Sequence, residues 1–248
     1  MSPAQFTRMT QHARRRSRAV SAVTAAALLL LACASKPTPP DWQGNAFAAL
    51  TGFSAAYLSG NSRLADFEFS RVKAEISRTG RPDLMARAEL TRCAVRAASL
   101  ELDACAGYQP LAQDATASEQ AYAEFLGGRW DAQSAALLPE HYRALALQTR
   151  TPGEPASPRA TGSVLGAIED PLARLIAAAA LLQHQRLTPA DIEAATDTAS
   201  GQGWRRPLLA WLGLQLRQAS AAGEAPAAAR LQRRIDLVLQ TGGAATPP

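Results

Sequence analysis

The sequence of 248 residues is long enough for one large domain or two small ones, and its formal net charge is +5. The whole excess lies in the first 18 residues, which carry five arginines and no acid, so that residues 33–248 contain 21 basic and 21 acidic side chains. Residues 33–248 are therefore formally neutral and lack the electrostatic footprint of a nucleic-acid-binding protein, so that class is excluded for this part of the chain. Alanine and leucine dominate, which favours helices over strands.

The N-terminal segment has the parts of a secretory signal. Basic residues come first, and a 14-residue apolar run, Ala19–Ala32, follows them. This run is shorter than the roughly 20 residues that cross a bilayer. We therefore expect residues 1–32 to be a signal peptide that is cleaved on export. The segment Arg14–Arg18 also resembles a twin-arginine signal, although the general secretion route is favoured.

The apolar run ends in Leu30-Leu31-Ala32-Cys33. These four residues resemble the lipobox of bacterial lipoproteins, a resemblance that covers residues 1 to about 35. It implies that the Cys33 sulfur receives a diacylglyceryl group, that cleavage precedes Cys33, and that the new amine is acylated, for example with palmitate. Two or three acyl chains anchor a protein stably, whereas one does not. Ala34, where an aspartate would imply retention at the inner membrane, implies the periplasmic face of the outer membrane.

Residues 33–44 then form a tether after the anchor. Its segment Ala34–Gly44, ASKPTPPDWQG, is rich in proline. Eleven such residues at about 3.1 Å each reach roughly 30 Å, which lifts the folded part away from the lipid headgroups.

We expect residues 45–148 to form an N-terminal helical part. Apolar residues recur at helical spacing, and Gly60 and Gly80 mark the ends of two helices. The expected helices span 45–58, 61–78, from Pro82 onward, from Thr116 or Ser118 to Gly127, 130–137 and 140–147.

Two cysteines, Cys93 and Cys105, follow the start of the third expected helix. A periplasmic location permits a disulfide between them. In one continuous helix their Cα atoms would lie roughly 18 Å apart, which no disulfide can bridge. Either the helix breaks near Ser99 and the cysteines are bridged, or the thiols stay free; we favour the break and the bridge.

Prolines and glycines interrupt the chain at 149–162, TRTPGEPASPRATG, which is either a surface loop or a boundary between two helical subdomains; we favour the loop. A C-terminal pair of helical hairpins is expected over 163–240, and residues 241–248 are expected to be a disordered tail. Helix starts are expected at Pro171, Pro189, Pro207 and Pro226. The first and third starts lie 36 residues apart, and the second and fourth lie 37 apart, a period typical of helical-hairpin solenoids.

The period and some residues resemble tetratricopeptide repeats. Gly60, Ala65 and Phe69 have that family's spacing, and so do Gly223 and Ala228. The predicted fold is therefore all-α, either helical hairpins stacked as a short tetratricopeptide-like solenoid or an irregular helical bundle. The resemblance implies binding of a peptide or protein, although fold alone does not determine function.

Sequence motifs for catalysis are absent. The chain has no G-x-S-x-G, G-x-x-x-x-G-K or H-E-x-x-H motif. His141 and His184 have no metal-ligand spacing around them. We therefore predict no catalytic residue, no metal and no cofactor.

One cluster, Gly201–Trp211, brings Trp204, Arg205, Arg206 and Trp211 to a single helix junction. Tryptophan and arginine are enriched at binding hot spots, so these four residues are candidates for contact with a partner. The alternative is that the tryptophans fill the core and the arginines cap neighbouring helices.

Three functional hypotheses remain. The favoured one is a non-enzymatic, lipid-anchored module of the cell envelope whose helices bind a protein or peptide partner. A structural spacer without a specific ligand would present a polar surface without a groove. An envelope enzyme, such as a peptidoglycan hydrolase, would gather acids and a histidine in one pocket.

Overall fold

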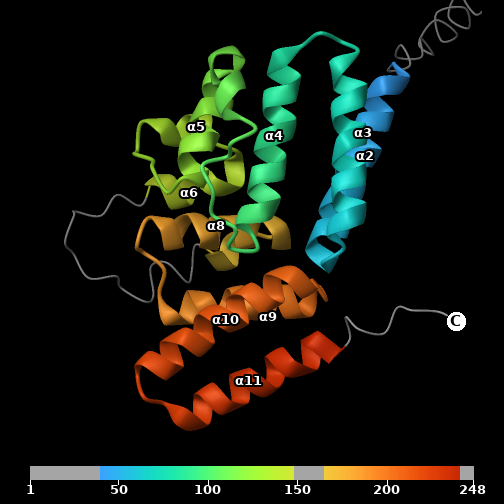
Figure 1. Cartoon of the computed structure of the whole chain (residues 1–248). Coiled ribbons are helices and arrows are strands. Elements are labelled where there is room, and N and C mark those ends of the chain that lie inside the picture. The colour runs from blue at the N-terminus through green and yellow to red at the C-terminus, as the bar shows by residue number, and fades with distance from the viewer. Residues whose placement is uncertain (1–39, 148–164, 241–248) are drawn as a thin grey trace, which may run out of the picture. The chain divides into compact units, whose positions relative to one another are not determined.

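The computed structural model describes residues 40–147 and 165–240 (Figure 1). The signal peptide, Cys33, most of the tether, the loop 149–162 and the tail 241–248 lie outside these residues. The chain divides into two units, Met1–Pro40 and Asp41–Pro248, and every described helix belongs to the second unit. The described residues form helices and no strand, which confirms the all-α prediction. None of the described helices is both long enough and apolar enough to cross a membrane.

The helices keep the order that the sequence predicts. They are α2 (Asp41–Ser59), α3 (Ser62–Ser77), α4 (Pro82–Ala97), η2 (Gln109–Asp114), α5 (Ala117–Leu126), η3 (Ser134–Leu137), α6 (Glu140–Leu147), α8 (Pro171–Gln183), α9 (Pro189–Gly201), α10 (Arg205–Ala221) and α11 (Ala225–Gln240).

The first two helices, α2 and α3, form a hairpin. Its turn uses Gly60, whose φ of 92° suits glycine, and Asn61, whose side chain accepts a hydrogen bond from the Leu64 amide (3.1 Å). Buried aromatic rings of Phe53 and Phe69 lie 5.2 Å apart between the helices. Helix α2 begins at Asp41, so the end of the predicted tether is wrong by four residues. The Asp41 carboxylate in the first turn favours this earlier start, because it complements the positive end of the helix dipole.

Helix α4 ends at Ala97, where the chain turns back. Leu100 and Cys105 adopt left-handed conformations with φ of 58° and 52°. The reversal brings the Cα atoms of Cys93 and Cys105 to 5.4 Å in a disulfide. Of the two alternatives that the sequence left open, the structure has the broken helix with the bridge.

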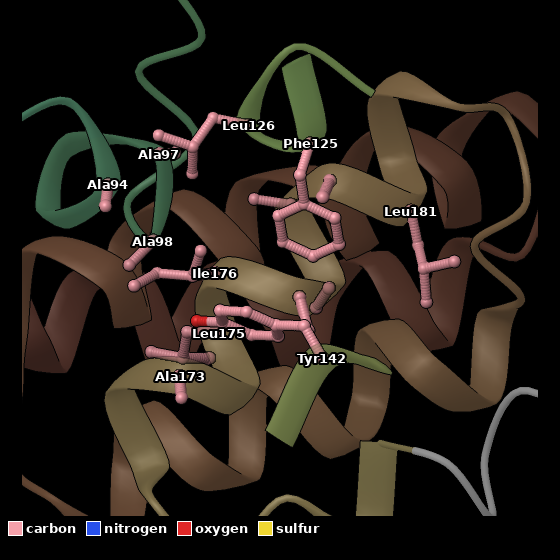
Figure 2. Close-up of a cluster of buried hydrophobic side chains, with 14 of the residues drawn as sticks. Ala94, Ala97, Ala98, Phe125, Leu126, Tyr142, Ala173, Leu175, Ile176 and Leu181 are labelled. Carbon is pink, nitrogen blue, oxygen red and sulfur yellow. The ribbon is translucent and has the colours of Figure 1, made fainter. Parts of the chain in front are cut away.

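The middle of the unit carries the main core. Helices α4, α5, α6 and α8 surround Phe125 and Tyr142, whose ring centres lie 4.6 Å apart (Figure 2). Helix α8 is buried along most of its length, including an unbroken alanine run, Ala177–Ala180. Such small side chains let neighbouring helices approach closely, so the larger rings can fill the remaining space.

The four C-terminal helices α8, α9, α10 and α11 pack consecutively (Figure 1). The Asp170 and Thr188 side chains cap α8 and α9, which begin at the predicted prolines. Helix α10 begins at Arg205, two residues before the predicted Pro207, and α11 begins one residue early. Proline is tolerated anywhere in a first turn, because amides there have no intrahelical acceptor.

Candidate functional site

Of the four residues that are candidates for contact with a partner, one is fully buried and three are half-buried. The buried one is Trp211, whose indole nitrogen donates a hydrogen bond to the Ala98 carbonyl (3.0 Å). Trp204 is half-buried and packs against both parts of the core. Of the two alternatives that the sequence left open, the structure therefore has Trp211 filling the core, where a partner cannot reach it.

The Arg206 side chain forms hydrogen bonds with three segments of the chain. Its guanidinium donates to the Tyr57 carbonyl (2.8 Å), the Ser62 hydroxyl (2.7 Å) and the Glu101 carboxylate (3.3 Å). It also lies 4.2 Å from the centre of the Tyr57 ring, and burial raises the pKa of that phenol, which stays neutral. This Arg206 side chain joins α10 to the first hairpin, so its main role in the structure is to hold helices together.

Arg205 makes a weaker connection. Its guanidinium donates to the Val238 carbonyl of α11 (3.3 Å). Both arginines therefore follow the alternative that the sequence analysis kept open, in which these side chains bind neighbouring helix ends.

An open cleft, which the sequence did not predict, lies between the loop after α4 and helix α5. Its volume is about 860 Å³. The wall on one side is the disulfide-closed segment with Asp103 and Cys105, and helix η2 continues this wall. The opposite side is formed by α5, and Gln183 of α8 closes one end.

The lining mixes apolar and polar side chains, and most of them are uncharged. Small side chains make up much of it, so a ligand backbone can approach closely: Ala104, Ala112, Ala117, Ala121 and Ala123. The amides of Gln109 and Gln120 are held by backbone carbonyls at 2.8 to 3.2 Å. Gln113 is exposed and makes no hydrogen bond to another described residue, so both ends of its amide are available to a ligand.

The two carboxylates of the cleft are already engaged. Arg129 contacts Glu124 at 2.5 Å and holds the pKa of that carboxyl below its usual value. Asp103 accepts a hydrogen bond from the Cys105 amide (2.9 Å) and pairs with Arg96 (2.9 Å). A carboxylate held in this way is poorly suited to exchange protons with a substrate.

The disulfide also affects whether a metal ion could bind at this position. Cys93, Asp103 and Cys105 bring three potential ligand atoms within 4.8 Å of one another. The two sulfurs are bonded to each other, so they do not offer the thiolates that a metal requires.

The two histidines of the described residues each contact an aromatic ring. The His184 ring lies 4.4 Å from Trp130, and its Nδ1 is 2.6 Å from the Gly128 carbonyl. The centre of the His141 ring lies 4.1 Å from that of Tyr142, and partial burial lowers the pKa of His141. His184 is thus held within the structure, whereas His141 lies on the surface.

Comparison of the chain with protein-family models, with curated proteins and with solved structures finds no match.

Proposed function

We propose that this protein is a lipoprotein anchored through Cys33 to the periplasmic face of the outer membrane, where it acts as a non-enzymatic binding module. The lipobox supports the anchor, and the tether gives the helices reach from the membrane. The tetratricopeptide resemblance stays a prediction and is not needed for this proposal.

The observation that carries the binding function is the cleft of about 860 Å³ beside the disulfide. A spacer would present a surface without a groove, and the described residues include one. The cleft suits an uncharged, extended peptide segment of a partner protein. Its lining has small alanine side chains, the amide of Gln113 is available, and both carboxylates are already paired. Such a segment would offer backbone N–H and C=O groups to the glutamine amides.

The anchor is tested by metabolic labelling with palmitate. Label should enter the wild-type chain and be absent from a Cys33→Ser variant, which should also leave the membrane fraction. An unlabelled wild-type chain with an intact residue 1 would contradict the anchor.

The cleft is tested in cells by a photo-crosslinking amino acid in place of Leu137, an exposed lining residue whose replacement leaves Gln113 intact. We expect one discrete adduct, lost when Ala117→Trp fills the cleft. The matched control places the crosslinker at Ala74, an exposed alanine of α3. Absence of an adduct at position 137, or equal adducts at both positions, would favour the spacer.

A further inference from the structure

The last two helices differ in charge from the rest of the described chain. Residues 205–240 carry six arginines and two acids, a net charge of +4. Residues 41–147 and 165–204 carry twelve basic and eighteen acidic side chains, a net charge of −6. Residues 205–240 thus form a basic region, and the other described helices form an acidic one.

Three arginines of α11 account for most of this charge. Arg230, Arg233 and Arg234 are exposed and form no hydrogen bond or ion pair with any described residue. Elsewhere arginines are commonly paired; Arg87, for example, contacts Glu119 at 2.7 Å. Unpaired guanidiniums in a row repel one another, so this arrangement favours an external anion.

Apolar side chains accompany the arginines. Residues three and four apart share a helix face, so Leu237 lies on the same face as Arg230, Arg233 and Arg234. Leu237 is 63% exposed. No residue of α11 is buried, although this helix packs on α10 through Leu231 and its neighbours.

We infer that this basic face of α11, defined by Arg230, Arg233, Arg234 and Leu237, docks an acidic amphipathic helix of a partner protein. Carboxylates flanking an apolar stripe would pair with the guanidiniums, and the stripe would cover Leu237. This site lies outside the cleft, and the inference does not depend on the cleft binding anything.

Two other occupants fit less well. A helix lying on a bilayer buries its most apolar face in the lipid, but that face of α11 is turned toward α10. A second copy docked through the same face would oppose identical arginines, which costs free energy.

The test measures binding of a synthetic peptide to the full-length chain in neutral detergent by fluorescence anisotropy. The peptide has about three heptads with leucine at the a and d positions and glutamate elsewhere. We expect micromolar binding that weakens as NaCl is raised, and no binding of the same peptide with lysine in place of glutamate. Equal binding of both peptides would overturn the inference.

The decisive variant is R230E/R233E/R234E, which should weaken peptide binding by about tenfold or more. Its matched control is R63E/R71E/R78E on and beside α3, which makes the same change in net charge. Arg71 and Arg78 form only surface pairs with Glu68 and Glu75, so the control should fold. Circular dichroism and melting temperature verify the fold of both variants.

Three results would overturn the inference. Equal loss in the control would mean that only net charge matters. Competition by phosphatidylglycerol vesicles without peptide specificity would assign the face to lipid. Concentration-dependent self-association that R230E/R233E/R234E abolishes would assign it to a second copy.

Discussion

Helices α8 and α11 have similar lengths and both contain several alanines and leucines, yet they occupy opposite environments. Eight residues of α8 are buried, and its neighbours cover it on several sides (Figure 2). Helix α11 has no buried residue and leaves three arginines without a described partner. The contrast shows how charged side chains limit burial: α8 carries one arginine, whereas α11 carries three arginines and an aspartate. An apolar helix is enclosed, whereas a helix with one basic face must keep that face accessible.

The connection between the two regions gives the largest expected effect. Trp211→Ala removes a fully buried indole from α10 and leaves the Ala98 carbonyl without its donor, so we expect a loss of about 3–5 kcal/mol in the free energy of unfolding. Urea denaturation measures this loss. A loss below about 1 kcal/mol would mean that the indole is not buried and bonded to Ala98 as described.

A matched pair of truncations tests the contrast directly. Leu175→Ala in α8 should cost about 2–5 kcal/mol, because that side chain is fully buried and its removal leaves a cavity. Leu231→Ala in α11 should cost less than about 1.5 kcal/mol, because the leucine is only half-buried. Equal losses in urea denaturation would break the comparison and indicate that α11 is enclosed.

The disulfide joins α4 to the loop after it, so we expect it to stabilise this region rather than the terminal helices α10 and α11. Replacing Cys93 and Cys105 by serine opens a loop with a sequence separation of 12, which should cost roughly 3 kcal/mol in the chain-entropy view. Reductant should lower the free energy of unfolding of the wild type by a similar amount, and its melting temperature should fall accordingly. The double serine variant is the control, and a response of that variant to reductant would point to a different cause.

Arg206→Ala should cost about 1–3 kcal/mol, because it removes the three hydrogen bonds and the ring contact of a partly exposed guanidinium. Arg205→Ala should cost less, since its one hydrogen bond is 3.3 Å long. Thermal melting compares the two variants. A larger loss of stability for Arg205→Ala would contradict the role of Arg206 in holding the helices together.

The sequence predicted those features that depend on neighbouring residues. Asp170-Pro171 and Thr188-Pro189 mark the starts of α8 and α9 correctly, because a cap and a first-turn proline act within one turn. The need for a helix break between Cys93 and Cys105 also followed from the rise of a helix alone.

The features that depend on distant contacts escaped prediction. The local sequence left open whether Trp211 contacts a partner or fills the core, and contacts with distant residues such as Ala98 decide for the core. The cleft depends on the left-handed backbone conformations of Leu100 and Cys105. Neither residue is a glycine, so the sequence did not indicate these conformations. Gln113 carried no signal, because a glutamine in a helical stretch usually faces solvent.

The covalent link between Cys93 and Cys105 has a consequence for biogenesis. Sulfur–sulfur bonds persist in oxidising compartments and are rare in the cytosol. Under the export route proposed above, the segment with Asp103 and Cys105, which lines the cleft, would therefore be closed by its disulfide only after export. Binding at this wall would then begin only in the compartment where the disulfide forms.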